Sequence, residues 1–290
     1  MQWKTGRFLL DLGTPKVMGI VNVTPDSFSD GGLHASLDAA LAHCERLVKD
    51  GADILDIGGE STRPGAQGLP VAEELERVLP VVRHAVTFGV PVSVDTYKPQ
   101  VMQAVLDLGA DIINDVWALR WSGDASGQTG VDVIRRHANC GVCLMHMHRD
   151  PQTMQVAPME GDVMPQVLSF LQQLTHTLRG LGVDSTRICI DPGIGFGKTV
   201  QQNFTLLAQQ AALLPMGYAV MAGWSRKSSL TAVTQRSLSS VATLDNRDRM
   251  VPSVTAALLA VQNGAHVVRV HDVKETVQAF KVFSAMQQQC

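Results

Sequence analysis

The stretch Arg187–Thr199, R-I-C-I-D-P-G-I-G-F-G-K-T, indicates both the fold of this chain and the place of its site. The apolar residues Ile188–Ile190 predict a short buried strand, which ends on the carboxylate of Asp191. Pro192 stops the strand, and the alternating glycines that follow allow a sharp turn and a close approach of the backbone to a ligand. A carboxylate at the C-terminal end of a strand, before a glycine-rich turn, is typical of sites in α/β proteins.

Two nucleotide-binding motifs do not fit this stretch. A phosphate-binding loop of the Walker A type requires a glycine five positions before Gly197, where Pro192 stands, so Lys198 is not predicted to bind phosphate. A dinucleotide fingerprint reads G-x-G-x-x-G, whereas the glycines here read G-x-G-x-G. The sequence therefore favours neither an ATPase nor a nicotinamide enzyme. The alternative to a ligand-binding loop is an ordinary turn that requires positive φ and that Asp191 caps.

Short apolar segments alternate with segments of helical period along the rest of the sequence. The predicted strands are Val17–Val23, Ile54–Ile57, Val90–Val94, Asp111–Val116, Val142–Met145, Ile188–Ile190, Tyr218–Ala222 and Val267–Val270. The predicted helices are Ser36–Lys49, Val71–Val86, Pro99–Leu108, Val131–His137, Val163–Leu181, Asn203–Leu214, Ser225–Val233, Ser253–Gln262 and Lys274–Gln287. A short strand or hairpin is expected at Phe8–Leu12, ahead of the first of these strands.

This alternation predicts the fold class. Strands separated by helices are parallel neighbours joined by right-handed crossovers. About eight such units in a chain of 290 residues, with no linker between them, predict an α/β protein with a (β/α)₈ TIM barrel that forms a single domain over residues 1–290. An open doubly wound sheet is the alternative, and the missing dinucleotide fingerprint favours the closed barrel.

The composition excludes several classes of protein. The chain has 24 basic and 27 acidic residues and no run of like charges, so neither nucleic acid nor a membrane surface is predicted as a partner. We expect no membrane span and no signal peptide, because no apolar run approaches ~18 residues. The five cysteines lie scattered in apolar segments, which favours a reducing cytoplasm. The lone C-x-x-C of Cys140 and Cys143 is interpreted as two small buried side chains rather than a redox or metal site.

Polar residues stand at the ends of nearly all the predicted strands. In a barrel, these strand ends meet at one face, where the active sites of such folds lie. One polar strand end is usually a turn cap, but so many at one mouth indicate a site. They are Asn22, Asp56, Asp95, Asn114 with Asp115, His146, Asp191 and Arg269 with His271, and the seventh strand runs into Gly223, Trp224, Ser225, Arg226 and Lys227.

The mixture of side chains favours a flat heterocycle and an anion as ligands. Several carboxylates would also suit acid–base hydrolysis or a divalent metal, but here Asp95 and Asp191 accompany an amide and a lysine. Such a set of donors and acceptors fits a heterocycle edge that carries N–H groups and a carbonyl. The residues Arg63, Arg269, His271 and Asn22 suit a phosphate or diphosphate, and the amide oxygen of Asn22 is a candidate Mg²⁺ ligand.

Eight motifs, in order along essentially the whole chain, resemble those of the dihydropteroate synthase family. Each lies at a predicted strand end or in the loop that follows it. They are V-M-G-I-V-N-V-T-P-D-S-F-S-D-G-G (Val17–Gly32), G-G-E-S-T-R-P-G-A (Gly58–Ala66), S-V-D-T-Y-K-P (Ser93–Pro99), I-N-D-V (Ile113–Val116), L-M-H-M (Leu144–Met147), D-P-G-I-G-F-G-K (Asp191–Lys198), S-R-K-S (Ser225–Ser228) and R-V-H-D-V (Arg269–Val273).

The resemblance implies a reaction and its setting. Enzymes of this family are cytoplasmic, Mg²⁺-dependent transferases of folate biosynthesis and are targets of sulfonamides. They condense (7,8-dihydropterin-6-yl)methyl diphosphate with 4-aminobenzoate to give 7,8-dihydropteroate and diphosphate. The resemblance also implies a homodimer packed through the late helices, where Thr255–Val261 and Val277–Met286 are apolar enough to serve.

The resemblance further implies roles for individual residues. The catalytic set would be Asp95, Lys227, Arg63 and His271. As a hypothesis, diphosphate leaves early, Asp95 stabilises the resulting pterin cation, and Arg63 and His271 stabilise the departing anion together with magnesium. The pterin edge would contact Asp95, Asn114, Asp191 and Lys227, with Arg269 over the ring face; Asn22 would hold the metal; and Thr62, Pro64, Phe196 and Ser228 would form the aminobenzoate pocket.

Two alternatives remain beside this interpretation. A pterin-binding methyltransferase would share the barrel and the pterin residues, but would not need the segments Ser61–Ala66 and Ser225–Ser228. A non-catalytic paralogue would have lost loop or anion residues, and none is lost here. The segments Thr24–Leu33 and Ser61–Leu69 are expected to close over the substrates.

Three features depart from the family pattern. Tyr97 stands where a smaller residue is common, Pro252 stands where a glycine is common, and Leu119–Gly130 is longer than usual. None of them removes a predicted contact, but Tyr97 is expected near the mouth of the barrel.

Overall fold

The computed structural model describes residues 1–23, 32–62, 65–66, 68–123, 127–150, 153–154, 156–234 and 246–289. Within them, eight parallel strands close into a barrel in the order β10-β3-β4-β5-β6-β7-β8-β9. These strands are β3 (Lys16–Asn22), β4 (Ile54–Gly58), β5 (Val92–Asp95), β6 (Ile112–Asp115), β7 (Gly141–Met145), β8 (Ile188–Asp191), β9 (Ala219–Ala222) and β10 (Val267–Val270). The predicted (β/α)₈ barrel is confirmed.

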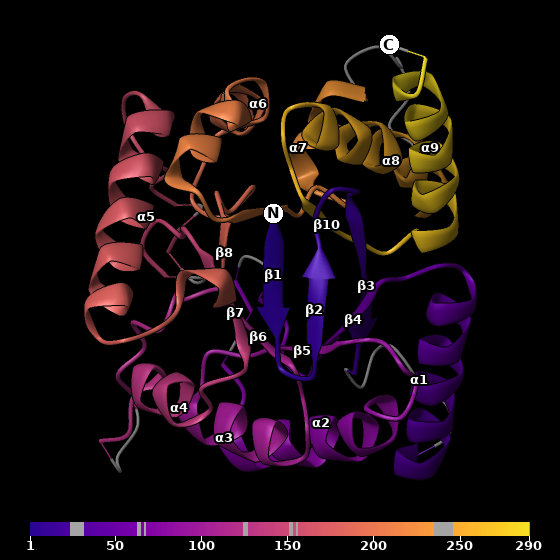
Figure 1. The fold of residues 1–290 in the computed structure, drawn as a ribbon, viewed down its shortest axis with the longest axis vertical. Coiled ribbons are helices and arrows are strands. Elements are labelled where there is room, and N and C mark those ends of the chain that lie inside the picture. Colours follow the sequence, from indigo (N-terminus) through magenta and orange to yellow (C-terminus); the bar gives the residue numbers. More distant parts are fainter. Residues whose placement is uncertain are drawn as a thin grey trace.

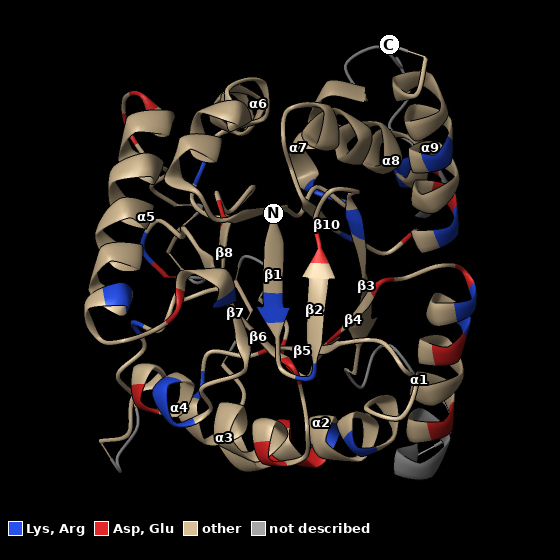
Figure 2. Cartoon of the chain, in the orientation of Figure 1, with Lys and Arg blue, Asp and Glu red and all other residues tan. Residues whose placement is uncertain are grey.

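Helices surround the barrel as a ring (Figure 1). They are α1 (Gly32–Lys49), α2 (Val71–Ala85), α3 (Pro99–Asp107), α4 (Gly130–Arg136), α5 (Val163–Gly180), α6 (Val200–Ala208), α7 (Ser228–Thr234), α8 (Asn246–Gln262) and α9 (Val273–Gln287), with the 3₁₀ turns η2 (Ser185–Arg187) and η3 (Gln210–Met216). Acidic and basic residues are interspersed along α1 and α9 (Figure 2), as the small net charge of −3 leads one to expect.

Three predicted helix boundaries were wrong, two of them for identifiable reasons. The helix predicted at Asn203–Leu214 is instead α6 followed by η3: a capping box between Thr199 and Gln202 starts α6 earlier, and Pro215 cannot donate to a continuing helix. Helix α7 begins at Ser228 rather than Ser225, because Arg226 has a φ of 59°, outside the helical region. Helix α8 begins at Asn246 and includes Pro252.

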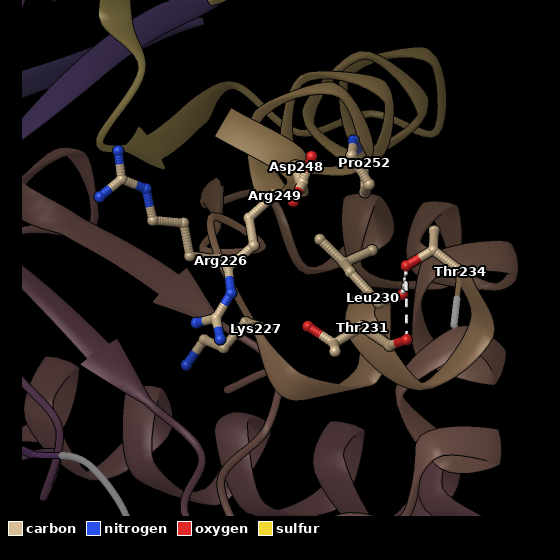
Figure 3. A pocket seen from close by; sticks show the side chains of 8 residues that line it. All are labelled: Arg226, Lys227, Leu230, Thr231, Thr234, Asp248, Arg249 and Pro252. Atoms are coloured by element: carbon tan, nitrogen blue, oxygen red, sulfur yellow. Dashed lines mark hydrogen bonds between the residues drawn. The ribbon is translucent and has the colours of Figure 1, made fainter. Parts of the chain in front are cut away.

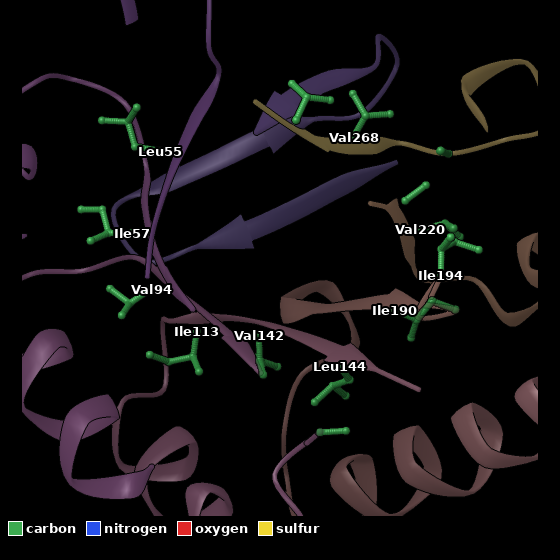
Figure 4. Packing of buried hydrophobic residues seen from close by; sticks show 14 of the residues in the cluster. Leu55, Ile57, Val94, Ile113, Val142, Leu144, Ile190, Ile194, Val220 and Val268 are labelled. Atoms are coloured by element: carbon green, nitrogen blue, oxygen red, sulfur yellow. The ribbon is translucent and has the colours of Figure 1, made fainter. Parts of the chain in front are cut away.

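The larger core lies between the strands and the helices. The outward-facing strand residues Leu55, Ile57, Val94, Ile113 and Val142 are fully buried there (Figure 4). Because both faces of each barrel strand are covered, the strands are nearly continuous apolar runs. Strands β3, β5, β6 and β8 end on a polar residue. This core holds the strand ends in fixed positions around the mouth.

An N-terminal hairpin closes the opposite end of the barrel. Strands β1 (Gln2–Thr5) and β2 (Phe8–Asp11) pair antiparallel, with Thr5 opposite Phe8. The hairpin lies across the barrel end that faces the viewer in Figure 1. Trp3 on it is fully buried and donates from Nε1 to the carbonyl of Arg187 at 2.9 Å. A ligand therefore enters the barrel from the carboxyl ends of the strands.

The hairpin turn is fixed by a buried carboxylate. Arg7 donates from Nη2 to Oδ2 of Asp111 at 2.8 Å, and a Cβ at Gly6 would lie only 2.5 Å from Oδ1 of Asp111. Asp111 stands immediately before β6, so this contact ties the hairpin to the barrel wall. The predicted strand or hairpin at Phe8–Leu12 is thus confirmed as a hairpin.

Two expectations from composition can be compared with the described residues. None of the described helices has the length and apolar character needed to cross a membrane. Cys44, Cys140, Cys143 and Cys189 are buried free thiols, as expected of small core side chains.

Candidate active site

Four side chains from different strands meet inside the mouth of the barrel. Asp95 at the end of β5 lies beside Asn114 at the end of β6 in the strand register. Arg269 on β10 donates from Nη2 to Oδ2 of Asp95 at 2.8 Å and from Nε to Oδ2 of Asp56 at 2.6 Å. Asn114 donates from Nδ2 to the same oxygen of Asp56 at 3.2 Å. The structure thus brings together Asp95, Asn114 and Arg269, as predicted.

Asp56 organises this group, although its place in the sequence predicts only a polar strand end. It is fully buried on β4, and its Oδ2 accepts hydrogen bonds from both Arg269 and Asn114. A charged residue so deeply buried is rarely found without a partner. In the sequence, the only indication is that Asp56 is a carboxylate one residue before the end of the predicted strand Ile54–Ile57, which is otherwise apolar.

Two buried carboxylate oxygens of this group remain as hydrogen-bond acceptors for a ligand. Burial raises the pKa of Asp95 to about 7, although the charge of Arg269 lowers it. Burial disfavours the charge of Arg269 as well, but Asp56 and Asp95 raise its pKa overall, so the guanidinium stays charged. Among the described residues, none donates a hydrogen bond to Oδ1 of Asp95 or Oδ1 of Asp56. Buried carboxylate oxygens of this kind favour a ligand that brings N–H donors.

Asp191 stands at the start of the glycine-rich turn after β8. It is 5% exposed, and its Oδ1 accepts a hydrogen bond from the backbone N–H of Gly193 at 2.7 Å. Burial raises the pKa of Asp191, whereas this N–H and the charge of Lys227 lower it. Gly193 has a φ of 70°, and a Cβ there would lie 1.9 Å from the carbonyl oxygen of His146. Only glycine fits this close crossing of two backbones.

Lys198 holds the same turn from inside. Its Nζ donates to the carbonyls of Gly193 at 2.8 Å, Phe196 at 3.1 Å and His146 at 3.2 Å. The side chain is buried and points into the protein, so it fixes the shape of the turn. Burial lowers the pKa of Lys198 to about 7, opposed by the charge of Asp191.

Lys227 faces the glycine-rich turn from the loop after β9. Its Nζ lies 4.2 Å from the centre of the Phe196 ring, and its aliphatic chain would contact a Cβ placed on Gly195. Burial lowers the pKa of Lys227 to about 8, opposed by the charge of Asp191. Within the described part of the chain, no oxygen accepts a hydrogen bond from this Nζ, so the ammonium is available to a ligand.

A left-handed residue directs Lys227 toward the mouth. Arg226 has a φ of 59°, its backbone N–H donates to Oγ of Ser253 at 2.9 Å, and its Nη2 donates to Oδ1 of Asp272 at 2.8 Å. Figure 3 shows that the side chains of Arg226 and Lys227 diverge, with Leu230 and Thr231 of α7 beside them. The strained backbone at Arg226 is thus compensated by contacts with α8 and with the start of α9.

The remaining predicted site residues lie at the rim, as far as they are described. His271 follows β10, and its Nδ1 shares a hydrogen bond of 2.9 Å with Oγ of Ser225. Ser228 is exposed at the start of α7, and Asn22 is exposed at the end of β3. Arg63 and Pro64 lie outside the described residues, as do residues 24–31 of the first predicted closing segment.

Thr62 belongs to a hollow beside the mouth. The hollow has a volume of about 190 Å³. Its lining is both polar and aromatic, and it consists of Glu60, Ser61, Thr62, Ala66, Gly68, Tyr97, Trp117 and Asp150. Tyr97, which is expected near the mouth, therefore does lie next to the segment that carries the predicted aminobenzoate residues.

Two polar strand ends serve the fold and do not face the site. Asp115 accepts hydrogen bonds from the backbone N–H groups of Trp117 and Leu119, each at 2.7 Å, and so holds a turn in which Ala118 and Leu119 have positive φ. His146 packs edge-on against Phe170, and burial lowers its pKa to about 2. Expecting both at the mouth was wrong, because neighbouring residues of a strand point to opposite faces.

Comparison with known proteins is consistent with this geometry. A family whose members are described as pterin binding enzymes matches residues 18–271. A dihydropteroate synthase of Neisseria meningitidis serogroup C is 45% identical over 98% of this chain and 97% of its own length. Xanthomonas albilineans dihydropteroate synthase with 4-aminobenzoic acid has a TM-score of 0.88 and 46% identity, over 99% of this chain and 98% of that one. Burkholderia cenocepacia dihydropteroate synthase complexed with 7,8-dihydropteroate has a TM-score of 0.86 and 45% identity, over 99% and 97%.

Proposed function

We propose that this chain, which belongs to the pterin-binding enzymes and within them to the dihydropteroate synthases, makes 7,8-dihydropteroate for folate biosynthesis. Its substrates would be (7,8-dihydropterin-6-yl)methyl diphosphate and 4-aminobenzoate. A C–N bond forms between the pterin methylene carbon and the amine, the C–O bond to diphosphate breaks, and the amine loses a proton. The observation that carries this proposal is the buried group of Asp95, Asn114 and Arg269 around Asp56, at the only open end of the barrel among the described residues.

The pterin ring would lie between the strand ends. The unpaired Oδ1 of Asp95 and the carboxylate of Asp191 accept the N–H groups of the ring edge, and Lys227 donates to its carbonyl oxygen. Arg269 is held in place by two carboxylates, so its planar guanidinium can cover the ring face without reorganising. This arrangement orients the exocyclic methylene toward the rim.

The chemical step would depend on charges that are fixed before the substrate binds. Loss of diphosphate leaves positive charge on the pterin, which the Asp95 carboxylate stabilises from inside the barrel. His271 and Arg63 would face the departing anion, and the position of His271 at the rim supports its share of this role. The amine of aminobenzoate then attacks from the side of Thr62, Pro64, Phe196 and Ser228.

A magnesium ion fits the residues at the rim. The described residues include no group of three His, Cys, Asp or Glu side chains placed to hold a metal. Mg²⁺ commonly takes one or two protein oxygens and completes its coordination with phosphate oxygens and water. The exposed amide of Asn22 suits such a site, and the ion, when bound, would neutralise charge on the diphosphate.

Assembly and location belong to the same proposal. We expect a homodimer through α8 and α9, where Val251 is 65% and Val282 is 73% exposed. Apolar side chains this exposed favour burial against a second copy. We also expect the enzyme to act in the cytoplasm, and the buried free cysteines suit that reducing compartment.

Diphosphate release tests the function. The full chain is mixed with the pterin diphosphate and Mg²⁺, with and without 4-aminobenzoate, and dihydropteroate is measured alongside. Release over many turnovers that depends on 4-aminobenzoate and equals dihydropteroate formed supports the proposal. Methyl transfer from methyltetrahydrofolate to an added cobalamin protein, without such release, would support the methyltransferase alternative. Pterin binding with neither reaction would support the non-catalytic paralogue.

A further inference from the structure

A buried cluster of side chains holds the first residues after β4, and it has no role in the proposed chemistry. We call it the Glu60 cluster, and it consists of Glu60, Glu74, Tyr97 and Lys98. The ammonium of Lys98 donates to Oε2 of Glu60 and to Oε2 of Glu74. The hydroxyl of Tyr97 donates to Oε1 of Glu60 at 2.9 Å. Both oxygens of Glu60 are therefore engaged.

The cluster is too deeply buried to be an ordinary surface ion pair. The side chains of Lys98, Glu60 and Glu74 are 4%, 9% and 1% exposed. Burial and the neighbouring charge of Glu60 raise the pKa of Tyr97, so its hydroxyl keeps its proton and remains a donor. Such charge-assisted hydrogen bonds fix geometry more firmly than exposed pairs, because water does not compete for them.

Helix α2 also contacts Gly59, the residue before Glu60. Gly59 offers its carbonyl to Nη1 of Arg77 at 2.9 Å, and a Cβ on Gly59 would lie 2.8 Å from Cγ1 of Val78. The backbone at residues 59–60 is thus held from α2 on one side and from the turn after β5 on the other. Thr62, the first described residue of the predicted aminobenzoate pocket, follows only two positions later.

Tyr97 connects Glu60 to the aromatic side of the hollow. Its ring centre lies 5.4 Å from that of Trp121 and 6.1 Å from that of Trp117, and the ammonium of Lys98 lies 5.1 Å from the same ring. Trp117 and Tyr97 line the hollow together with Thr62. The side chain of Tyr97 therefore connects the two tryptophans with Glu60, near the start of the segment after β4.

We propose that Tyr97, through Glu60 and Lys98, is a positioning residue that sets affinity for the aromatic amine. The cluster fixes the direction in which the chain leaves β4 at Glu60, and with it the place of Thr62 two residues later. The pterin group around Asp56 does not contact the cluster through any hydrogen bond among the described residues. Loosening the cluster should therefore weaken 4-aminobenzoate and spare the pterin. This inference rests on the proposed function.

The variant Tyr97→Phe tests it with little change in packing. The phenylalanine ring keeps its contacts with the tryptophans and with Lys98 but loses the hydrogen bond to Glu60. Because a hydrogen bond to a charged group is lost, KM for 4-aminobenzoate should rise about tenfold, while KM for the pterin diphosphate stays within about twofold. Tyr218→Phe is the matched control, since Tyr218 precedes β9 at the far end of the barrel and should change neither constant.

A second pair of variants distinguishes the positioning role from a general loss of stability. Lys98→Gln should raise KM for 4-aminobenzoate more than Tyr97→Phe does, and Lys98→Arg, which keeps the charge between the two glutamates, should restore part of the affinity. Calorimetric binding of the pterin diphosphate shows whether each variant keeps its site. Equal rises in both KM values, or an unchanged KM for 4-aminobenzoate in Tyr97→Phe, would overturn the inference.

The outcome separates this inference from the function on which it rests. If the unaltered chain forms no dihydropteroate, the proposed function is wrong. If the unaltered chain forms it and the Tyr97→Phe variant behaves like Tyr218→Phe, only the positioning role is wrong.

Discussion

Arg269 donates from Nη2 to Oδ2 of Asp95 at 2.8 Å, although 174 positions separate the two residues in the sequence. The contact exists because β10 and β5 belong to one closed barrel, whose strand ends face a common mouth. Its consequence is that the Asp95 carboxylate is oriented before any ligand arrives, with Oδ1 left for the ligand. A carboxylate and a guanidinium fixed in this way can stabilise charge without reorganising when the substrate binds.

Replacing Asp95 by asparagine should slow turnover about a hundredfold or more, because a neutral amide cannot stabilise positive charge on the pterin. Binding of the pterin diphosphate should persist, since the amide still fits the space and can accept one hydrogen bond. Steady-state kinetics and calorimetry on the same preparation measure both. Turnover close to that of the unaltered enzyme, with normal pterin binding, would remove Asp95 from the chemical step.

Asp56→Ala should weaken pterin binding and reduce the free energy of unfolding by roughly 3 kcal/mol, because Arg269 loses one of two buried partners. The matched control is Asp53→Ala, which alters a partly exposed carboxylate at the amino end of the same strand. Denaturant unfolding and pterin titration compare the two. If both variants bind pterin like the unaltered chain, Asp56 does not position Arg269.

The pH dependence of kcat/KM for the pterin diphosphate should be bell-shaped. Activity should fall as the pH drops below about 7, where Asp95 becomes protonated, because its raised pKa makes the carboxylate the form present above that value. It should fall again above about 8, where Lys227 loses its proton, because its lowered pKa makes the ammonium the form present below that value.

Lys227→Gln offers a check on this assignment. The variant should bind pterin more weakly but lose only the alkaline limb of the profile. An alkaline limb that survives in this variant would have to come from another group.

Lys198→Met should reduce the free energy of unfolding by roughly 2 kcal/mol or more, because three buried carbonyls lose their shared donor. Pterin affinity should fall as well, since the turn carries Asp191 and Phe196. Lys274→Met, a change at an exposed position of α9, serves as the control. A stable Lys198→Met variant with normal pterin binding would show that the turn holds its shape without the lysine.

The sequence was sufficient for the barrel and for most of the site. Alternating apolar strands and helices predict the fold, and polar strand ends place Asp95, Asn114, Asp191 and Arg269 at one mouth. It was not sufficient for side-chain direction within a strand end. Asn114 and Asp115 are adjacent, yet only Asn114 bonds to Asp56, whereas Asp115 holds the following turn.

Other features depend on contacts that no local pattern encodes. The partners of Asp56 come from β6 and β10, so its importance follows from barrel closure and strand register. The inward direction of Lys198 follows from three carbonyls that the folded turn presents. The Glu60 cluster joins α2 to the turn after β5, and nothing in the separate motifs indicates that Tyr97 would reach Glu60.

Calorimetric titration with (7,8-dihydropterin-6-yl)methyl diphosphate, on the unaltered chain and on Asp191→Asn and Asn114→Ala, shows whether the strand ends bind the pterin. We expect saturable binding of one pterin per chain, weakened at least about tenfold in each variant, because each loses a polar contact with the buried ring edge. Equal affinity in all three proteins, or no binding to the unaltered chain, would contradict it.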